Sequence, residues 1–408
     1  MADNNQPSPD KDFVDVRTLL EQRSLEQLNQ LAEEYFARLT TRDYHLAKPF
    51  GAIDETPQLL INFAVVLQGL ALCPGLTVLE FGAGTCWAAR YLSQLGCQVI
   101  ALDVSPTALD IGQELYRHHP VIGNKPAARF LQYDGLRIDL PDESVDRIIC
   151  LDAFHHVPNP GQVLREMGRV LKNGGIAGFA EPGPEHSQSA QSQYEMRTFG
   201  VIENDVKIRE IWRDARLAHF TDIKVAVFNV PPFHLSLDDF EAFLNDEPIT
   251  AVYVLATREF LKNQRNFFLY KGPPAASDSR FRAGLQAEIR ITSNNLSAIE
   301  GETIVARATV TNTSNSVWLP RSAQLGAVML GVHVYHADET IHRHSFHWEA
   351  LTEGEGRPIR PNESVDVEIR MPPLPKGDYI LEFDMVSNDV CWFSLNGSPT
   401  VRVPLEVQ

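Results

Sequence analysis

The sequence predicts an α/β domain built on a doubly wound sheet, followed by a smaller all-β domain. Two observations predict the first domain: short apolar runs that end in glycine or acidic residues recur as far as residue 272, and helical patterns separate them. The second domain follows from a change of pattern. Residues 273–282 have the composition of a linker, and residues 283–408 contain short alternating segments at the spacing of a β-sandwich.

The stretch TVLEFGAGTCW, residues 77–87, is the centre of the first domain. Its apolar start is too short for a helix and suits a buried parallel strand, and a helical pattern begins directly after its glycines. Gly82 and Gly84 let the backbone approach a ligand closely. Residues 97–104 form a second predicted strand, and Asp103 stands where such folds present a carboxylate to ribose hydroxyls. Together these features predict a nucleotide-binding βαβ unit.

Two residues argue against a nicotinamide or flavin site, which would make the protein an oxidoreductase. The pattern G-x-G-x-x-G needs a glycine where Trp87 stands, and a carboxylate at Glu80 repels a pyrophosphate. The same carboxylate can receive a cationic ammonium group. The sequence therefore favours a cationic cofactor over a dinucleotide.

The other elements follow in order along the chain. Residues 1–11 read as a disordered tail and residues 12–72 as a helical cap. Helices are predicted to begin at Ser105-Pro106 and at Asn159-Pro160, and the second to end at Asn173-Gly174-Gly175. A further helix is predicted over residues 205–220. The later strands are predicted at 128–133, 145–152, 176–180, 222–230 and 266–271.

Residues 40–272 resemble the small-molecule branch of the class I S-adenosylmethionine-dependent methyltransferases. The family's first motif, acid-x-Gly-x-Gly-x-Gly, is matched by residues 80–86 except at Cys86, a departure that bears on close packing. A second motif, D-A-x-H-H-V-x-x-P followed by E-x-x-R-V-L-K-x-G-G, is matched by residues 152–175. The resemblance implies a Rossmann-like methyltransferase sheet with an antiparallel last strand, and S-adenosyl-L-methionine as cofactor.

The resemblance also implies the residues that hold the cofactor. Gly82 and Gly84 are expected to border its methionine part, Asp103 to hold the ribose, and Asp134 to bind the adenine amino group. For Asp134 the alternative is a turn-forming Asp-Gly pair. The expected cofactor-binding residues are Glu80, Gly82, Ala83, Gly84, Asp103, Val104, Tyr133, Asp134, Gly135 and Asp152.

The expected catalytic residues are His155, His156 and Glu181, at the carboxyl ends of the fourth and fifth predicted strands. A neutral imidazole can remove a hydroxyl proton during methyl transfer. The alternatives are that a histidine only orders its loop, or that alignment of the reactants suffices without a base. Glu181 and His186 are also candidates for gripping sugar-like hydroxyls.

The functional hypothesis is methyl transfer from S-adenosylmethionine to a hydroxyl, in preference to an amine or carboxyl, of a small-molecule or saccharide acceptor. The alternative is a non-catalytic methyltransferase-fold scaffold whose sandwich binds glycan or protein. No metal site is expected, because the five cysteines are scattered and read as small buried hydrophobes. The sequence does not indicate an oligomeric state.

Composition bounds the partners of the protein. The net charge of -17 over 408 residues argues against nucleic acid as a partner, since phosphate binding needs a basic face. The start of the chain is polar, and the longest apolar region is too short to span a bilayer. We therefore expect a cytoplasmic protein without a membrane span.

The second domain is expected to contain about seven strands, at 286–292, 302–311, 326–335, 364–370, 378–386, 390–395 and 400–406. Its N-T-S-N-S-V-W turn resembles that of immunoglobulin-like modules, and its later strands resemble accessory domains of bacterial glycan-modifying enzymes. The histidines at 333, 336, 342, 344 and 347 favour a solvated face over a metal site. The tryptophans at 318, 348 and 392 favour core packing over a sugar-stacking platform.

Overall fold

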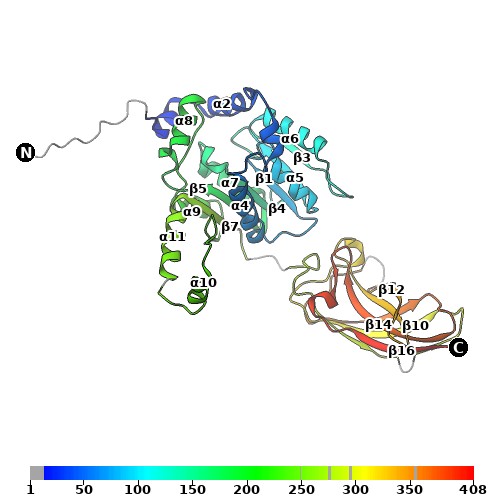
Figure 1. Ribbon diagram of the computed structural model, residues 1–408. Coiled ribbons are helices and arrows are strands. Elements are labelled where there is room, and N and C mark those ends of the chain that lie inside the picture. Colours follow the sequence, from blue (N-terminus) through cyan, green and yellow to red (C-terminus); the bar gives the residue numbers. More distant parts are fainter. Residues whose placement is uncertain (1–12, 249, 274–276, 294–295, 353–355) are drawn as a thin grey trace, which may run out of the picture. The chain divides into compact units, whose positions relative to one another are not determined.

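The computed structural model describes residues 13–248, 250–273, 277–293, 296–352 and 356–408. Contacts divide the chain into two units, Met1–Ala275 and Ala276–Gln408 (Figure 1). The first unit contains the α/β sheet and its helices. The second contains strands and short turns. Within the described residues, no helix combines the length and the apolar character that a membrane span requires.

Seven strands form the sheet of the first unit, in the order β3-β2-β1-β4-β5-β7-β6. β7 is antiparallel to both of its neighbours, whereas the other pairs are parallel. The predicted doubly wound fold class and its antiparallel last strand are thus confirmed. The strand order reverses beside β1, so ligands are expected outside the carboxyl ends of β1 and β4. The strands are β1 (Thr77–Phe81), β2 (Gln98–Asp103), β3 (Arg129–Gln132), β4 (Val145–Leu151), β5 (Leu171–Pro182), β6 (Asp222–Val225) and β7 (Gln264–Tyr270).

Helices cover both faces of the sheet, and successive side chains of β7 pack on opposite faces. Phe267 stacks on Phe179 at a ring-centroid distance of 4.6 Å, in the cluster to which α7 contributes Met167. Phe268 points the other way and fills the space beside Gly69 of α4. The helices are α1 (Val16–Gln22), α2 (Leu25–Ala37), α3 (Asp43–Ala47), α4 (Thr56–Gly69), α5 (Trp87–Gln94), α6 (Pro106–His118), α7 (Pro160–Val170), α8 (Ala190–Thr198), α9 (Ile208–Leu217), α10 (Leu237–Leu244) and α11 (Thr250–Asn263).

The end of α7 differs from the prediction. The helix ends at Val170, and Asn173-Gly174-Gly175 lies within β5, so the predicted helix end is wrong. The pairing with β4 shifts in register between Leu171 and Ile176, because the chain bulges there. Gly174 adopts a φ of 82°, a conformation that residues with a Cβ adopt less readily. Its N–H donates to Lys271 O.

Residues 226–263 also differ from the prediction. The predicted strand 222–230 ends at Val225, and the two helices α10 and α11 stand between β6 and β7 (Figure 1). The polar stretch after β5 contains a further unpredicted helix, α8. These helices were missed because they lack the buried apolar stripe of core helices: no side chain of α10 is buried.

The second unit has two sheets, in the orders β13-β10-β8 and β12-β11-β14-β16-β9, and β15 pairs with β14. Both sheets contribute to one apolar core, in which Trp318 is fully buried. An immunoglobulin-like topology stays a prediction. The strands are β8 (Ala287–Ile291), β9 (Leu296–Ala298), β10 (Ile304–Asn312), β11 (Val328–His336), β12 (Ile341–Ala350), β13 (Ser364–Met371), β14 (Gly377–Ser387), β15 (Cys391–Trp392) and β16 (Val401–Val407).

Two of these strands, β9 and β12, were not predicted, and the strand expected at 390–395 is only the two-residue β15 followed by a 3-10 turn. β12 is an edge strand of its sheet and is mostly exposed. Its polar, histidine-rich sequence lacks the apolar alternation of a half-buried strand, which explains the miss. The five cysteines are all buried, as expected.

Candidate active site

A glycine turn joins β1 to α5. Gly82 and Gly84 have positive φ angles of 66° and 50°. A Cβ added to Gly82 would lie 2.4 Å from Cβ of Ala153, so only glycine lets this turn pack against the loop after β4. At Gly84 the nearest atom would be 3.9 Å away, which leaves the backbone open on that side. The turn therefore offers a ligand close access to the backbone.

Asp103 ends β2 beside this turn and is 8% exposed. Its Oδ2 accepts a hydrogen bond from Gly84 N at 2.7 Å, and its Oδ1 accepts one from Ser105 N at 2.9 Å. Burial raises the pKa of the Asp103 carboxyl, and these amides oppose the rise. Each oxygen keeps a second lone pair. The carboxylate thus has the capacity to accept ribose hydroxyls while it holds the glycine turn.

Glu80 lies in β1, directly before its last residue. It is 3% exposed, and its Oε2 accepts a hydrogen bond from Ala89 N, in the first turn of α5, at 2.8 Å. Burial raises the pKa of Glu80 to about 8. The side chain therefore anchors α5 to β1. Its expected contact with the cofactor ammonium stays a prediction.

A cavity of about 540 Å³ lies between α2 and the ends of β2 and β3. Asn29 of α2 donates to Asp134 O at 2.9 Å, and Ser105 donates to Glu33 of α2 at 2.6 Å, which holds the helix over the strand ends. The phenolic oxygen of Tyr133 is buried without a hydrogen-bond partner among the described residues. The lining residues are Ser24, Leu25, Glu26, Asn29, Gln30, Glu33, Val104, Pro106, Gln132, Tyr133, Asp134 and Leu136.

Asp134 lies in the wall of this cavity and also stabilises a turn. Its Oδ1 accepts hydrogen bonds from Leu136 N at 2.7 Å and Arg137 N at 2.8 Å, and Gly135 has a φ of 87°. This is the turn-forming role that the sequence left open. The cavity position is compatible with an adenine contact as well, so that contact stays a prediction.

Glu181 organises the end of β4 from the neighbouring strand. The side chain is fully buried. Its Oε1 accepts from Ala153 N at 3.1 Å and Phe154 N at 2.9 Å, and its Oε2 accepts from His155 N at 3.2 Å. The same Oε2 lies 2.8 Å from His155 Nδ1. Burial alone would lower the pKa of His155, but the hydrogen bond and charge of Glu181 raise it to about 9.

Glu203, from the loop between α8 and α9, completes the group. Its Oε2 lies 2.7 Å from His186 Nε2 and 3.9 Å from His155 Nε2, and its Oε1 lies 3.3 Å from His156 Nδ1. Burial opposes ionisation of Glu203, yet the neighbouring imidazoles lower its pKa to about 2. We call His155, His156, Glu181, His186 and Glu203 the histidine–carboxylate cluster. Sequence reasoning missed Glu203 because nothing local marks it.

Most of the sequence-predicted site residues gather at the carboxyl edge of the sheet. Gly82, Ala83 and Gly84 follow β1, Asp103 and Val104 end β2, and residues 133–135 follow β3. His155 and His156 follow β4, and the contact between Gly82 and Ala153 joins their turn to the glycine turn. Asp152 lies at the same edge with an exposed side chain, 4.0 Å from His155 Nδ1.

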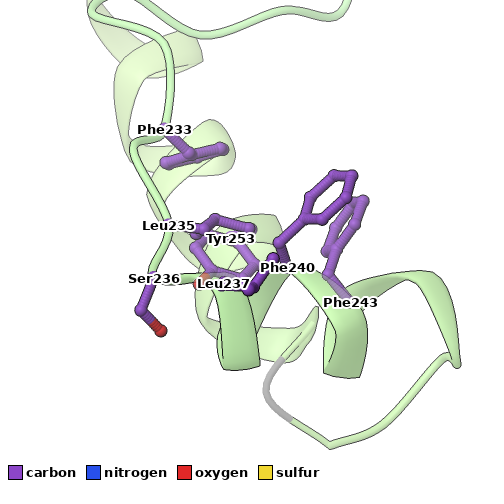
Figure 2. A pocket seen from close by; sticks show the side chains of 7 residues that line it. All are labelled: Phe233, Leu235, Ser236, Leu237, Phe240, Phe243 and Tyr253. Carbon is purple, nitrogen blue, oxygen red and sulfur yellow. The ribbon is translucent and has the colours of Figure 1, made fainter.

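A second cavity, of about 580 Å³, lies between α10 and α11 and is apolar (Figure 2). Tyr253 of α11 packs against Phe233 and Phe243, at ring-centroid distances of 4.9 Å and 5.6 Å. The far end of α11 meets β5 directly after Glu181, where Gly183 N donates to Asn263 O at 2.9 Å. The insertion between β6 and β7, residues 226–263, therefore ends beside the strand that carries Glu181. Its lining residues are Phe233, Leu235, Ser236, Leu237, Phe240, Phe243 and Tyr253.

The strand order, the glycine turn and the acid that ends β2 make a comparison with known proteins informative. Residues 79–179 match the methyltransferase domain family. The match runs from β1 into β5 and so contains the glycine turn, Asp103 and both histidines of the β4 turn. It supports an enzyme that uses S-adenosylmethionine.

Curated relatives are similar to about a third of the chain. A demethylmenaquinone methyltransferase of Renibacterium salmoninarum is 28% identical over 143 residues, 34% of this chain and 56% of its own. A thiol S-methyltransferase of Rattus norvegicus is 30% identical over 168 residues, 38% and 64%. A ubiquinone biosynthesis O-methyltransferase of Paracidovorax citrulli is 26% identical over 147 residues, 36% and 58%. The chain thus spans somewhat more than half the length of these relatives.

Solved structures are similar to part of the chain. The geranyl diphosphate C-methyltransferase of Streptomyces coelicolor, in complex with Mg²⁺, geranyl diphosphate and S-adenosyl-L-homocysteine, has 15% sequence identity. The similarity covers 59% of this chain and 96% of that chain, with a TM-score of 0.42.

Proposed function

We propose that this protein transfers a methyl group from S-adenosylmethionine to a hydroxyl of a small-molecule or saccharide acceptor. The observation that carries the proposal is the histidine–carboxylate cluster next to the glycine turn, joined to it through the contact between Gly82 and Ala153. A hydroxyl must lose its proton to become a methyl ether, and this cluster offers proton acceptors at that place. A carboxyl acceptor is already ionised at neutral pH and has no need of them.

The residues at the carboxyl edge fit the cofactor. The open backbone at Gly84 leaves room beside β1, and the lone pairs of Asp103 are available to ribose hydroxyls. The cavity under α2 has the volume for an adenine ring. When bound, the cofactor supplies a methyl group on a sulfonium centre.

The transfer step requires the cluster to accept the proton of the acceptor hydroxyl. The acceptor oxygen forms a bond to the methyl carbon while the methyl–sulfur bond breaks, and that electron pair remains on sulfur. The hydroxyl proton leaves the oxygen and passes through the cluster, where His156 is the exposed member. Glu203 Oε1 lies 3.3 Å from His156 Nδ1. Glu181 holds His155 and the whole turn in place.

The test is methyl transfer by the full chain with methyl-labelled S-adenosylmethionine. The acceptor panel contains nucleotide sugars, oligosaccharides and small phenols or quinols, with amines and carboxylic acids for comparison. We expect a methylated hydroxyl product, and its loss in His156→Ala. A product methylated on nitrogen would overturn the hydroxyl assignment. Cofactor binding without any product would support the alternative of a scaffold with a glycan- or protein-binding second unit.

A further inference from the structure

We propose that the histidine–carboxylate cluster binds one divalent transition-metal ion, with His155, His156 and Glu203 as its protein ligands. A ring nitrogen of each histidine and a carboxylate oxygen of Glu203 all lie within 4.8 Å of one another. Two imidazoles and one carboxylate form the donor set of catalytic zinc sites and of non-haem iron sites. His155 Nε2 lies 3.9 Å from Glu203 Oε2, so the carboxylate stands beside the ring. Two ligands of one ion stand at roughly 3.3 Å when each bond is about 2.0 Å, so binding requires the three side chains to move closer together.

Each proposed ligand is held from behind by a hydrogen bond. His155 Nδ1 lies 2.8 Å from Glu181 Oε2, and His156 Nδ1 lies 2.6 Å from Ile202 O. Glu203 Oε2 lies 2.7 Å from His186 Nε2. Metal-binding histidines usually donate their second ring N–H to a carboxylate or a backbone carbonyl, and ligating carboxylates are in turn hydrogen-bonded. These contacts leave His155 Nε2, His156 Nε2 and Glu203 Oε1 as the ligand atoms.

Glu203 supplies an independent sign of a missing ligand. The residue is 3% exposed, and its Oε1 is buried without a hydrogen-bond partner among the described residues. This oxygen lies 3.3 Å from His156 Nδ1, a nitrogen that is also 2.6 Å from Ile202 O. A cation at the cluster would compensate the buried charge of Glu203. Among the described residues, this is also the one group of three or more ligating side chains close enough to hold an ion.

The site is closed on one side and open on the other. His155 and Glu203 are buried, whereas the His156 side chain is exposed. Catalytic metal sites keep one coordination position for water or substrate, and the His156 side provides it. The role of the ion rests on the proposed function: an acceptor hydroxyl bound at that position becomes more acidic, and because His156 is then a ligand, its proton is released to water on the open side and not to His156.

The test is metal binding by the full chain after treatment with a chelator. We titrate Zn²⁺ and Co²⁺ by calorimetry and record the visible absorption of Co²⁺, with Mg²⁺ as the control ion. We expect one Zn²⁺ or Co²⁺ per chain and no Mg²⁺, because imidazole is a poor ligand for Mg²⁺. Glu203→Gln and His156→Ala should weaken binding at least tenfold, and Glu181→Gln about ten- to hundredfold.

The matched control is His342→Ala in the second unit, where His342 Nδ1 lies 3.1 Å from His336 Nε2 and offers a competing pair of donors. We expect this variant to bind the ion as the natural chain does. The proposal is overturned if Glu203→Gln leaves Co²⁺ binding unchanged, or if His342→Ala abolishes it. Calorimetry of S-adenosylmethionine on the same samples reports folding. Cofactor binding without metal binding refutes this inference alone, and metal binding without cofactor binding refutes the proposed function alone.

Discussion

Sγ of Cys86 occupies the space into which a Cβ on Gly112 would project, at a distance of only 2.4 Å. Cys86 precedes α5 with a φ of 60°, and Gly112 lies in the middle of α6. Glycine inside a helix costs about 1 kcal/mol relative to alanine. Its presence in α6 is explained by this close approach. A third glycine in the first motif would stand at Cys86 and leave space there. Here Gly112 of α6 provides that space, and the Cys86 side chain fills it.

Gly112→Ala should therefore destabilise the first unit by roughly 1–3 kcal/mol, because the added Cβ overpacks the contact with Cys86. Denaturant unfolding measures this, with Gln113→Ala at an exposed position of the same helix as control. Cys86→Gly should recover part of the loss in the Gly112→Ala background, since it removes the sulfur and suits a positive φ. Equal stability of the single and double variants would contradict this explanation.

Asp103→Ala should weaken S-adenosylmethionine binding by roughly 2–4 kcal/mol, or about thirty- to eight-hundred-fold in Kd. The variant loses the carboxylate expected to hold the ribose and also the acceptor for Gly84 N. Isothermal calorimetry measures the change, and Asp110→Ala at an exposed position of α6 is the matched control. Unchanged binding in Asp103→Ala would mean that the cofactor does not contact the end of β2.

Glu181→Gln should lower the free energy of unfolding by roughly 2–4 kcal/mol. Three backbone N–H groups and the His155 ring bind the carboxylate, whereas an amide has only one accepting oxygen. Thermal and denaturant unfolding measure the effect, and Glu185→Gln at an exposed position serves as control. Methyl transfer should fall in Glu181→Gln more than cofactor binding does. Equal losses would show that the residue only supports the fold.

The second unit should lose stability as pH falls from about 6.5 to 4. Burial, and then the nearby His344, lower the pKa of His333 to about 4. Ser345 N donates to His333 Nδ1 at 3.0 Å, which requires the neutral ring. A lowered histidine pKa means that the stability is complete above the unfolded pKa and declines below it, by up to about 3 kcal/mol at about 1.4 kcal/mol per pKa unit.

Denaturant unfolding of the full chain at pH 7.5 and pH 5 measures this decline, as the change in the free energy of unfolding for the transition of the second unit. His333→Gln keeps an oxygen that can accept from Ser345 N and does not titrate. The variant should therefore show a flatter pH dependence than the natural chain. The same slope in both proteins would mean that groups other than His333 cause the decline. Among its neighbours, Glu382 raises the pKa of His333 and so opposes the effect of burial.

The sequence predicts the sheet and the glycine turn because their signals are local. The run from β1 through Gly84 to α5 is contiguous. A glycine in a sequence indicates a backbone position that can take a positive φ, and Gly82 and Gly84 both have one. Asp103 follows at a fixed distance along the same unit. These residues gather at one edge because parallel strands end there, so no tertiary information is needed to group them.

The rest of the site depends on contacts between distant segments. Glu203 reaches the β4 turn from a loop that follows α8, and no spacing rule joins it to His155. Gly112 reads as a weak position in a helix until the sulfur of Cys86 is seen against it. The edge strand β12 and the exposed helix α10 lack the apolar periodicity on which prediction relies.

The insertion between β6 and β7 has a consequence for how acceptor choice can diversify. The two strands are paired from Asp222 with Tyr270 to Val225 with Phe267, and Ala226 N donates to Asn266 O at 2.8 Å. The insertion therefore leaves and re-enters the sheet at adjacent points, so its length and composition can change without altering the sheet's register. Helix pairs exchanged between homologous chains at these two points would bring new apolar surfaces to the same carboxyl edge of the sheet. Such grafts offer a route by which one scaffold acquires new substrates.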